Sequence, residues 1–273
     1  MGAIDSFSWT LPGVAISVEV SAASDRGLVR RINEDSYVAI PPVFLVADGM
    51  GGHSFGDRAS QATARVFATR LKGHPAPTIQ DVLDAVHEAD RIVHQIGDEE
   101  LAGSTLAGIA FVAGDDSTEP RWMVFNVGDS RIYRFDDELE QLSVDHSAVQ
   151  ELLDEGTITA AQTRDHPDRN VVTRAIGLGD TEPDVWILPT GGRERFLICS
   201  DGLTKELDDA TITEVLLRDG EGLSPADRLV SAALAAGGLD NITVVVVDAI
   251  VVHQGDDHEG FIPARLEQTL PRG

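Results

Sequence analysis

Short runs in which apolar and polar residues alternate recur along most of this chain, and such runs are typical of β-strands. They lie at residues 13–20, 36–47, 104–113, 121–135, 185–188, 195–199 and 241–252. Several of them follow one another across a short polar turn, with no helical segment between them. Because strands joined by short turns pair antiparallel, the pattern predicts antiparallel sheets instead of a parallel sheet with crossover helices.

Three other segments repeat apolar residues at positions i, i+3, i+4 and i+7, which predicts amphipathic helices. They are residues 64–71, 79–86 and 224–238. The third begins with Ser-Pro, a favoured pair at a helix N-cap and first turn, and it ends in two glycines. Residues 147–168 have a helical pattern between two strands, so we expect a surface flap there.

These elements predict one domain of the α+β class over residues 1–252. No long linker rich in proline, glycine or serine divides the segment. Residues 253–273 are polar with scattered apolar positions, and we expect them to form a loosely held tail.

Charge and composition exclude several classes of function. The 273 residues include 21 Lys and Arg against 46 Asp and Glu, a formal net charge of −25. Nucleic acid and anionic membrane surfaces repel such a chain, because no run of basic residues offsets the charge. No apolar run approaches the roughly 20 residues that cross a bilayer, and the amino terminus does not read as a secretory signal. One cysteine fits a reducing compartment, so we expect a cytoplasmic monomer.

Carboxylates recur at the ends of the predicted strands. Asp48, Asp129 and Asp201 each follow an apolar strand directly or after one small residue. Asp240 lies just before the last strand, and Asp35 lies just before an early one. If these ends share one edge of the fold, five carboxylates meet there.

Clustered carboxylates in a pocket of low dielectric constant need a positive partner. All the candidate ligands are hard oxygen atoms, which favours Mg²⁺ or Mn²⁺ over zinc or copper. Two such ions about 4 Å apart would lower the pKa of a shared water for attack on phosphorus. Arg30, five residues before Asp35, has the guanidinium group that binds phosphate oxygens in pairs. The pattern therefore predicts hydrolysis of a phosphate ester.

Each of these features also has a purely structural interpretation. Asp-Gly pairs such as Asp48-Gly49 are common in tight turns, and Asp201 has the position of a helix N-cap. Arg30 is equally compatible with a surface charge, as is its neighbour Arg31. The turn interpretation does not explain well why an aspartate follows a strand so many times in one chain.

Seven stretches of the sequence resemble motifs of the metal-dependent type 2C (PPM) protein serine/threonine phosphatases in their bacterial form. They are residues 24–35, 46–53, 103–105, 127–131, 174–177, 199–203 and 239–243. They occur in the order of the family and extend over most of the chain, so the set is specific.

The resemblance implies two antiparallel β-sheets packed face to face and flanked by helices on both sides, with two Mn²⁺ or Mg²⁺ ions at one end. In the matching motifs, Asp48 bridges both ions, and Asp201 and Asp240 complete the coordination of one. The Gly49 carbonyl helps to hold the other ion, which Asp35 contacts mainly through water.

Further residues are placed by the same resemblance. Asp129 corresponds to a ligand of a third, weaker ion in bacterial members, and Arg30 corresponds to the arginine that binds the substrate phosphate. Animal members carry a histidine, often described as the general acid, where this chain has Met50; His53 is a nearby substitute. Some bacterial relatives use a serine at the third ion, and Asn170 stands there in this chain.

The implied activity is hydrolysis of phosphoserine and phosphothreonine in proteins, either Ser/Thr kinases or their targets, by a water that two metal ions activate. Three alternatives are weighed against it. Residues 52–56 match the G-x-S-x-G motif of a serine hydrolase, with Ser54 as nucleophile. A cysteine phosphatase would need arginine six residues after Cys199, where Lys205 stands. A catalytically weak phosphoprotein-binding module would be expected to lack some of the site residues, all of which are present.

Overall fold

The computed structural model describes residues 4–51, 55–96, 102–114, 119–163, 165–179, 181–218, 222–253 and 267–268. The elements of its first sheet pair in the order β1 (Ile4–Leu11), β2 (Val14–Asp25), β12 (Ile242–His253), β11 (Gly192–Cys199), β8 (Arg131–Asp136) and β9 (Glu138–Gln141). Every pair in this sheet is antiparallel.

The second sheet has the order β13 (Glu267–Gln268), β10 (Asp184–Pro189), β7 (Arg121–Val127), β6 (Leu106–Val112), β4 (Val43–Gly51) and β3 (Asp35–Ile40). A short strand, β5 (Ala102–Ser104), pairs with the last residues of β4. All of these pairs are also antiparallel.

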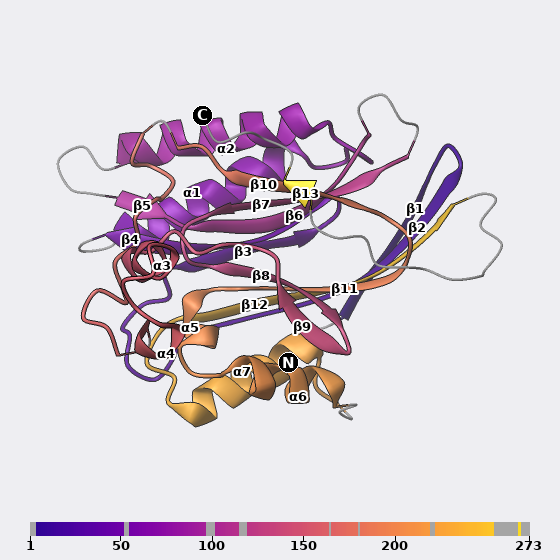
Figure 1. Cartoon of the computed structure of the whole chain (residues 1–273). Helices are drawn as coiled ribbons and strands as arrows, with labels where there is room; N and C mark the ends of the chain where they lie inside the picture. The colour runs from indigo at the N-terminus through magenta and orange to yellow at the C-terminus, as the bar shows by residue number, and fades with distance from the viewer. Residues whose placement is uncertain are drawn as a thin grey trace.

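Helices cover the outer faces of the two sheets, as Figure 1 shows. On the second sheet lie α1 (Phe55–Arg70) and α2 (Ile79–Ile96). On the first lie α5 (Asp201–Thr204), α6 (Asp209–Leu217) and α7 (Pro225–Ala236). The predicted arrangement of two antiparallel sheets between layers of helices is confirmed. Within the described residues, no helix combines the length and the hydropathy of a membrane-crossing helix.

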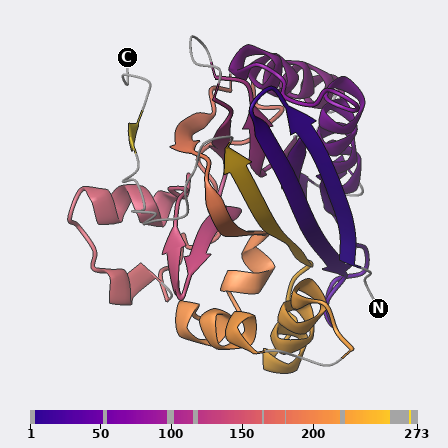
Figure 2. The same ribbon diagram turned by 90° about the vertical axis from the view of Figure 1, so that its right-hand side faces the viewer.

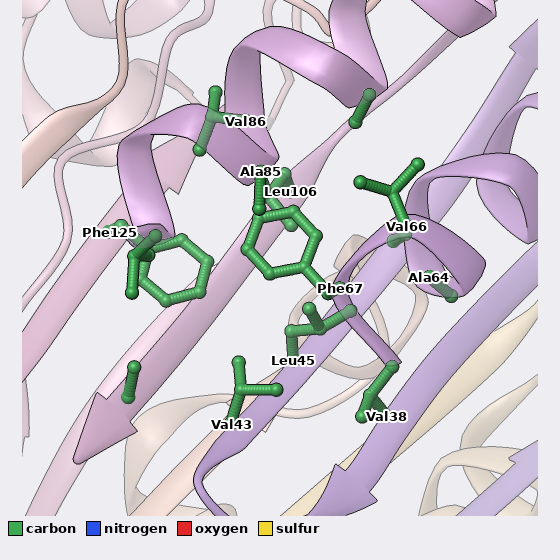
Figure 3. Packing of buried hydrophobic residues seen from close by; sticks show 14 of the residues in the cluster. Val38, Val43, Leu45, Ala64, Val66, Phe67, Ala85, Val86, Leu106 and Phe125 are labelled. Atoms are coloured by element: carbon green, nitrogen blue, oxygen red, sulfur yellow. The ribbon is translucent and has the colours of Figure 1, made fainter. Parts of the chain in front are cut away.

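The alternation of side chains along the strands of the second sheet divides its apolar residues between two cores. In β4, Val43 and Leu45 face the helices α1 and α2, while Phe44 and Val46 face the other sheet. Figure 3 shows the helix-facing core, where the ring of Phe67 from α1 stacks on Phe125 with 5.5 Å between centroids. Because both faces of β4 are buried, the strand reads as a continuous apolar run.

Aromatic residues fill the core between the sheets. The rings of Phe111 and Trp122 in the second sheet meet edge to face at 5.2 Å, and Trp122 also contacts Phe196 of the first sheet at 5.3 Å. The Trp122 indole N–H donates to the Glu194 carboxylate at 2.8 Å, which links the two sheets by a buried hydrogen bond.

The expected flap, residues 147–168, contains α3 (Ala148–Asp154) and α4 (Ala160–Thr163). Figure 2 shows both helices to one side of the layers. The amide of Ala148 donates to the carbonyl of Val171 at 2.9 Å, which joins the two ends of the segment.

Several boundaries differ from the sequence predictions. The run at 36–47 is two strands that meet at a Pro41-Pro42 turn, and the run at 121–135 is divided by a turn at residues 128–130. Strand β1 and helix α6 were not predicted. Within the predicted loose tail, residues 267–268 pair with β10.

Candidate metal and phosphate site

Two of the candidate carboxylates are cross-strand partners. Asp35 begins β3 and lies directly opposite Asp48, near the end of β4. Directly opposite residues of an antiparallel pair have Cβ atoms about 4.5–5.5 Å apart, and like charges at that separation destabilise a sheet. The register therefore places two acids side by side, which calls for a compensating positive charge.

Three more carboxylates reach the same end of the fold. Asp201 is the first residue of α5, directly after β11 and Ser200, and Asp129 lies in the turn between β7 and β8. Asp240 lies in the loop between α7 and β12. The end of β4, β5 and α5 lie together at one end of the sandwich in Figure 1.

Burial and mutual repulsion shift the titration of these acids. Burial raises the pKa of Asp48 well above its usual range, and the charges of Asp35, Asp201, Asp129 and Asp240 raise it further. Burial also raises the pKa values of Asp35 and Asp129, each to about 7. Removal from water raises the pKa of Asp201, although Lys205 opposes that shift. The five carboxylates therefore form one electrostatically connected group.

Two basic side chains partly neutralise this group. An Arg30 guanidinium nitrogen donates to Asp240 at 2.8 Å, and the arginine side chain is half exposed. The ammonium group of Lys205 contacts the carboxylate of Asp201 and lies 3.9 Å from that of Asp240. Sequence reasoning did not include Lys205 in the site, although its position four residues after Asp201 on one helical turn was a usable signal.

The donors present leave part of the negative charge without partners. Buried oxygen atoms of Asp35 (Oδ1) and Asp201 (Oδ1) accept no hydrogen bond from the described residues. Within the described residues, no three His, Cys, Asp or Glu side chains lie close enough together to hold a metal ion already. Unsatisfied carboxylate oxygens among excess acids are the donor set that Mg²⁺ and Mn²⁺ prefer, so the residues fit such an ion.

Ser200 and Thr105 hold the cross-strand pair of acids, one at the Asp35 carboxylate and the other at the Asp48 backbone. Ser200 donates its hydroxyl to Asp35 at 2.8 Å and accepts the Thr243 amide at 2.9 Å. Thr105 accepts the Asp48 amide on its hydroxyl at 2.9 Å and donates its own amide to the Asp48 carbonyl at 2.8 Å. These contacts fix both ends of the cross-strand pair of acids.

Gly49 is required by the close approach of two backbone segments. A Cβ atom at this position would lie 2.0 Å from the Gly56 carbonyl oxygen and 2.7 Å from that of Glu34. The Gly49 amide also donates to Glu34 at 3.1 Å. The segment after Asp48 can therefore pack against the start of α1 only without a side chain at this residue.

The side chain of Asn241 attaches the Arg30 segment to the acids. Its amide nitrogen donates to the carbonyls of Arg26 at 2.8 Å and Ile32 at 2.9 Å, and its oxygen accepts the Glu34 amide at 2.9 Å. Because Asn241 directly follows Asp240, one residue joins both sides of the site. The sequence motif contained Asn241, but no local signal indicated this function.

Other sequence candidates have different outcomes. His53 and Ser54 lie outside the described residues, so the proposed general acid and the serine hydrolase alternative are untested there. Asn170 is exposed in the turn after α4. Cys199 is fully buried, and burial raises the pKa of its thiol to about 12, which keeps it protonated and unreactive.

A model of a known protein family matches the part of the chain that carries most of these residues. The model described as "Protein phosphatase 2C" matches residues 33–234. The chain belongs to the protein phosphatase 2C family. All the candidate carboxylates except Asp240 lie within the matched range, and Arg30 lies just before it.

Individual relatives agree with the 2C assignment. Serine/threonine protein phosphatase PstP of Mycobacterium tuberculosis is 39% identical over 243 residues, 87% of this chain and 46% of PstP. The chain thus spans about half the length of that curated relative. Serine/threonine phosphatase stp of Listeria innocua is 32% identical over 86% of this chain and 97% of its own length. A crystal structure of the PstP catalytic domain with two manganese ions superimposes with a TM-score of 0.76 at 36% identity, covering 86% of this chain and 99% of that one.

Proposed function

We propose that this chain is a metal-dependent protein serine/threonine phosphatase that hydrolyses phosphoserine and phosphothreonine. The observation that carries the proposal is a group of five carboxylates at one end of the fold, with buried unsatisfied oxygen atoms on Asp35 and Asp201, beside the half-exposed guanidinium group of Arg30. Membership of the 2C family, relatives named as serine/threonine phosphatases and the manganese ions of the PstP structure support it.

The resemblance supplies the proposed role of each metal ligand. Asp48 would bridge two Mn²⁺ or Mg²⁺ ions, and Asp201 and Asp240 would complete one of them. The Gly49 carbonyl and Asp35, the latter through water, would serve the other. Asp129 would join Asp201 at a third, weaker site, whose occupancy depends on the remaining ligands there.

When bound, the ions would supply the positive charge that activates a water molecule for attack on phosphorus. Arg30 would bind two phosphoryl oxygens and orient the group, since its planar guanidinium matches that geometry. Asp240 holds the guanidinium at 2.8 Å, so the arginine is preorganised before substrate arrives. His53 remains the candidate proton donor to the leaving oxygen.

The cellular role follows the same proposal. Substrates would be phosphorylated proteins, either Ser/Thr kinases or their targets, in the cytoplasm, with the chain acting as a monomer. Residues 1–252 would form the catalytic domain, and the flap at 147–168 would adjoin the site. Residues 253–273 would form a tail, of which residues 267–268 pair with β10.

A test compares hydrolysis of p-nitrophenyl phosphate and of a phosphothreonine peptide with Mn²⁺ and after addition of EDTA. Activity should require the metal, whereas a serine hydrolase that uses Ser54 would continue in EDTA. Arg30→Ala should raise the KM for the peptide about tenfold or more, because it removes a charged phosphate contact. Arg218→Ala, at an exposed arginine just after α6, is the control and should leave KM unchanged. Peptide binding without turnover would favour the phosphoprotein-binding alternative.

A further inference from the structure

Four large apolar side chains are exposed around Arg30. Leu28, Val29 and Ile32 are 67%, 63% and 45% exposed, and Leu239 is 64% exposed. We call these four residues the apolar rim. Isolated exposed apolar side chains are ordinary, but a group of them beside a binding site is typical of an interaction surface.

The rim belongs to two backbone segments that run side by side. The Leu28 amide donates to the Gly238 carbonyl at 2.7 Å, and a Cβ atom on Gly238 would lie 3.1 Å from the Leu28 side chain. Two residues further along each segment, Arg30 bonds to Asp240. Leu28 and Leu239 therefore lie next to the residue pair that would meet the phosphoryl group.

Close backbone contacts hold the two segments of the rim together. Asn241 fixes the first segment at Arg26, Ile32 and Glu34 by three hydrogen bonds. Gly27 packs so closely on the second segment that a Cβ atom there would lie 2.1 Å from the Asp240 carbonyl oxygen. These contacts position the backbone from which the rim side chains extend.

The charge of this segment differs from that of the whole chain. Arg26, Arg30 and Arg31 flank Leu28 and Val29 in the sequence of a protein whose net charge is −25. This local positive charge complements a phosphorylated segment. If a phosphoresidue is bound at Arg30, its neighbours in the substrate would lie over the surface formed by residues within two positions of Arg30. An extended chain advances about 3.3–3.6 Å per residue, so these neighbours would reach that surface.

We propose that the apolar rim binds bulky apolar side chains that flank the phosphoserine or phosphothreonine of a substrate protein. The inference deepens the proposed function and rests on it. The rim would desolvate when substrate binds, so apolar neighbours would add affinity in proportion to the surface that they cover. The same surface would add little affinity for a substrate in which polar residues flank the phosphoresidue.

The experiment uses two phosphothreonine peptides of equal length and charge, one with leucine on both sides of the phosphoresidue and one with serine. The full chain with Mn²⁺ should show a kcat/KM about tenfold higher for the leucine peptide, the scale of an apolar pocket contact. In Val29→Ser, and independently in Leu239→Ser, this ratio should fall toward one.

The matched control is Leu217→Ser, because Leu217 is 56% exposed at the end of α6, outside the two rim segments. This variant should keep the wild-type ratio. Equal kcat/KM values for the two peptides in the wild type would contradict the proposed binding by the rim. An unchanged ratio in both rim variants would contradict it as well.

Failure of the proposed function gives a different result. If the chain hydrolyses neither p-nitrophenyl phosphate nor a peptide with Mn²⁺, the phosphatase proposal is wrong. Binding of the two peptides, measured by fluorescence anisotropy, then still tests whether the rim binds apolar side chains. Tighter binding of the leucine peptide supports this proposal, and equal binding contradicts it.

Discussion

Buried acids occur in two regions of this protein, and each region neutralises them in its own way. Between the sheets, Glu194 accepts the Trp122 indole N–H at 2.8 Å, and burial raises its pKa to about 7. No second acid is among the groups that shift this pKa. A single proton therefore removes the charge from this interior position.

At the end of the sandwich, one proton cannot neutralise the acids, because five of them lie there. Asp48 feels the charges of four other aspartates, and Arg30 and Lys205 offset only part of the total. Buried oxygens of Asp35 and Asp201 are left without donors. One proton can neutralise a lone buried acid, whereas a group of unsatisfied acids has the oxygen donors that a divalent cation prefers.

The largest effect that separates the two regions is expected from Asp48→Asn. With Mn²⁺, its kcat/KM for a phosphothreonine peptide should fall at least about a thousandfold, because the proposed bridging ligand is lost. In EDTA the same variant should unfold at a higher temperature than wild type, since it removes a buried acid opposite Asp35 that must either carry a charge or take up a proton. Glu194→Gln is the control and should retain turnover. Activity of Asp48→Asn within tenfold of wild type would contradict the site.

The next effect is stabilisation by the metal itself. At a Mn²⁺ concentration of about 100 times Kd, a ligand that binds only the folded state adds about 2.7 kcal/mol to the free energy of unfolding. Thermal unfolding with Mn²⁺ and with EDTA should show this increase in wild type and in Glu194→Gln. It should be much smaller in Asp201→Asn. An unfolding temperature that does not respond to Mn²⁺ would contradict the proposal that the folded protein binds this ion.

The smallest effect concerns Glu194 and pH. Its pKa is raised from 4.5 in the unfolded chain to about 7, so the folded protein retains a proton that the unfolded chain has released. The free energy of unfolding should therefore fall as pH rises through this window, by about 1–3 kcal/mol from this residue. Urea unfolding at pH 5 and pH 8 should show a smaller loss in Glu194→Gln. Equal losses in both proteins would mean that Glu194 keeps an ordinary pKa.

The strands could be predicted because apolar runs and turn residues are local signals. Strand β1 was missed because only Phe7, Trp9 and Leu11 alternate apolar within an otherwise polar segment, and these three pack against the core between the sheets. The division of residues 121–135 depends on the turn at 128–130, whose Gly-Asp-Ser sequence was a usable local signal.

The aspartates of the site were found because each lies beside a strand. Lys205 and Asn241 were not assigned a function, since their roles depend on partners that sequence spacing does not reveal. Asn241 bonds to Arg26 and Glu34, more than 200 positions earlier in the chain. Such contacts exist only after β12 pairs with β2, which the local pattern does not specify.

The pairing of Asp35 with Asp48 also has a consequence for folding errors. Successive side chains of a strand point to opposite faces, so a slip of β3 by one residue along β4 would set Ser36 or Glu34 opposite Asp48 and turn Asp35 away. A chain trapped in that shifted alignment would lose its affinity for divalent ions together with its correct hydrogen bonding. Thermal unfolding with and without Mn²⁺ would then distinguish the two alignments, because the ion would stabilise only correctly aligned molecules.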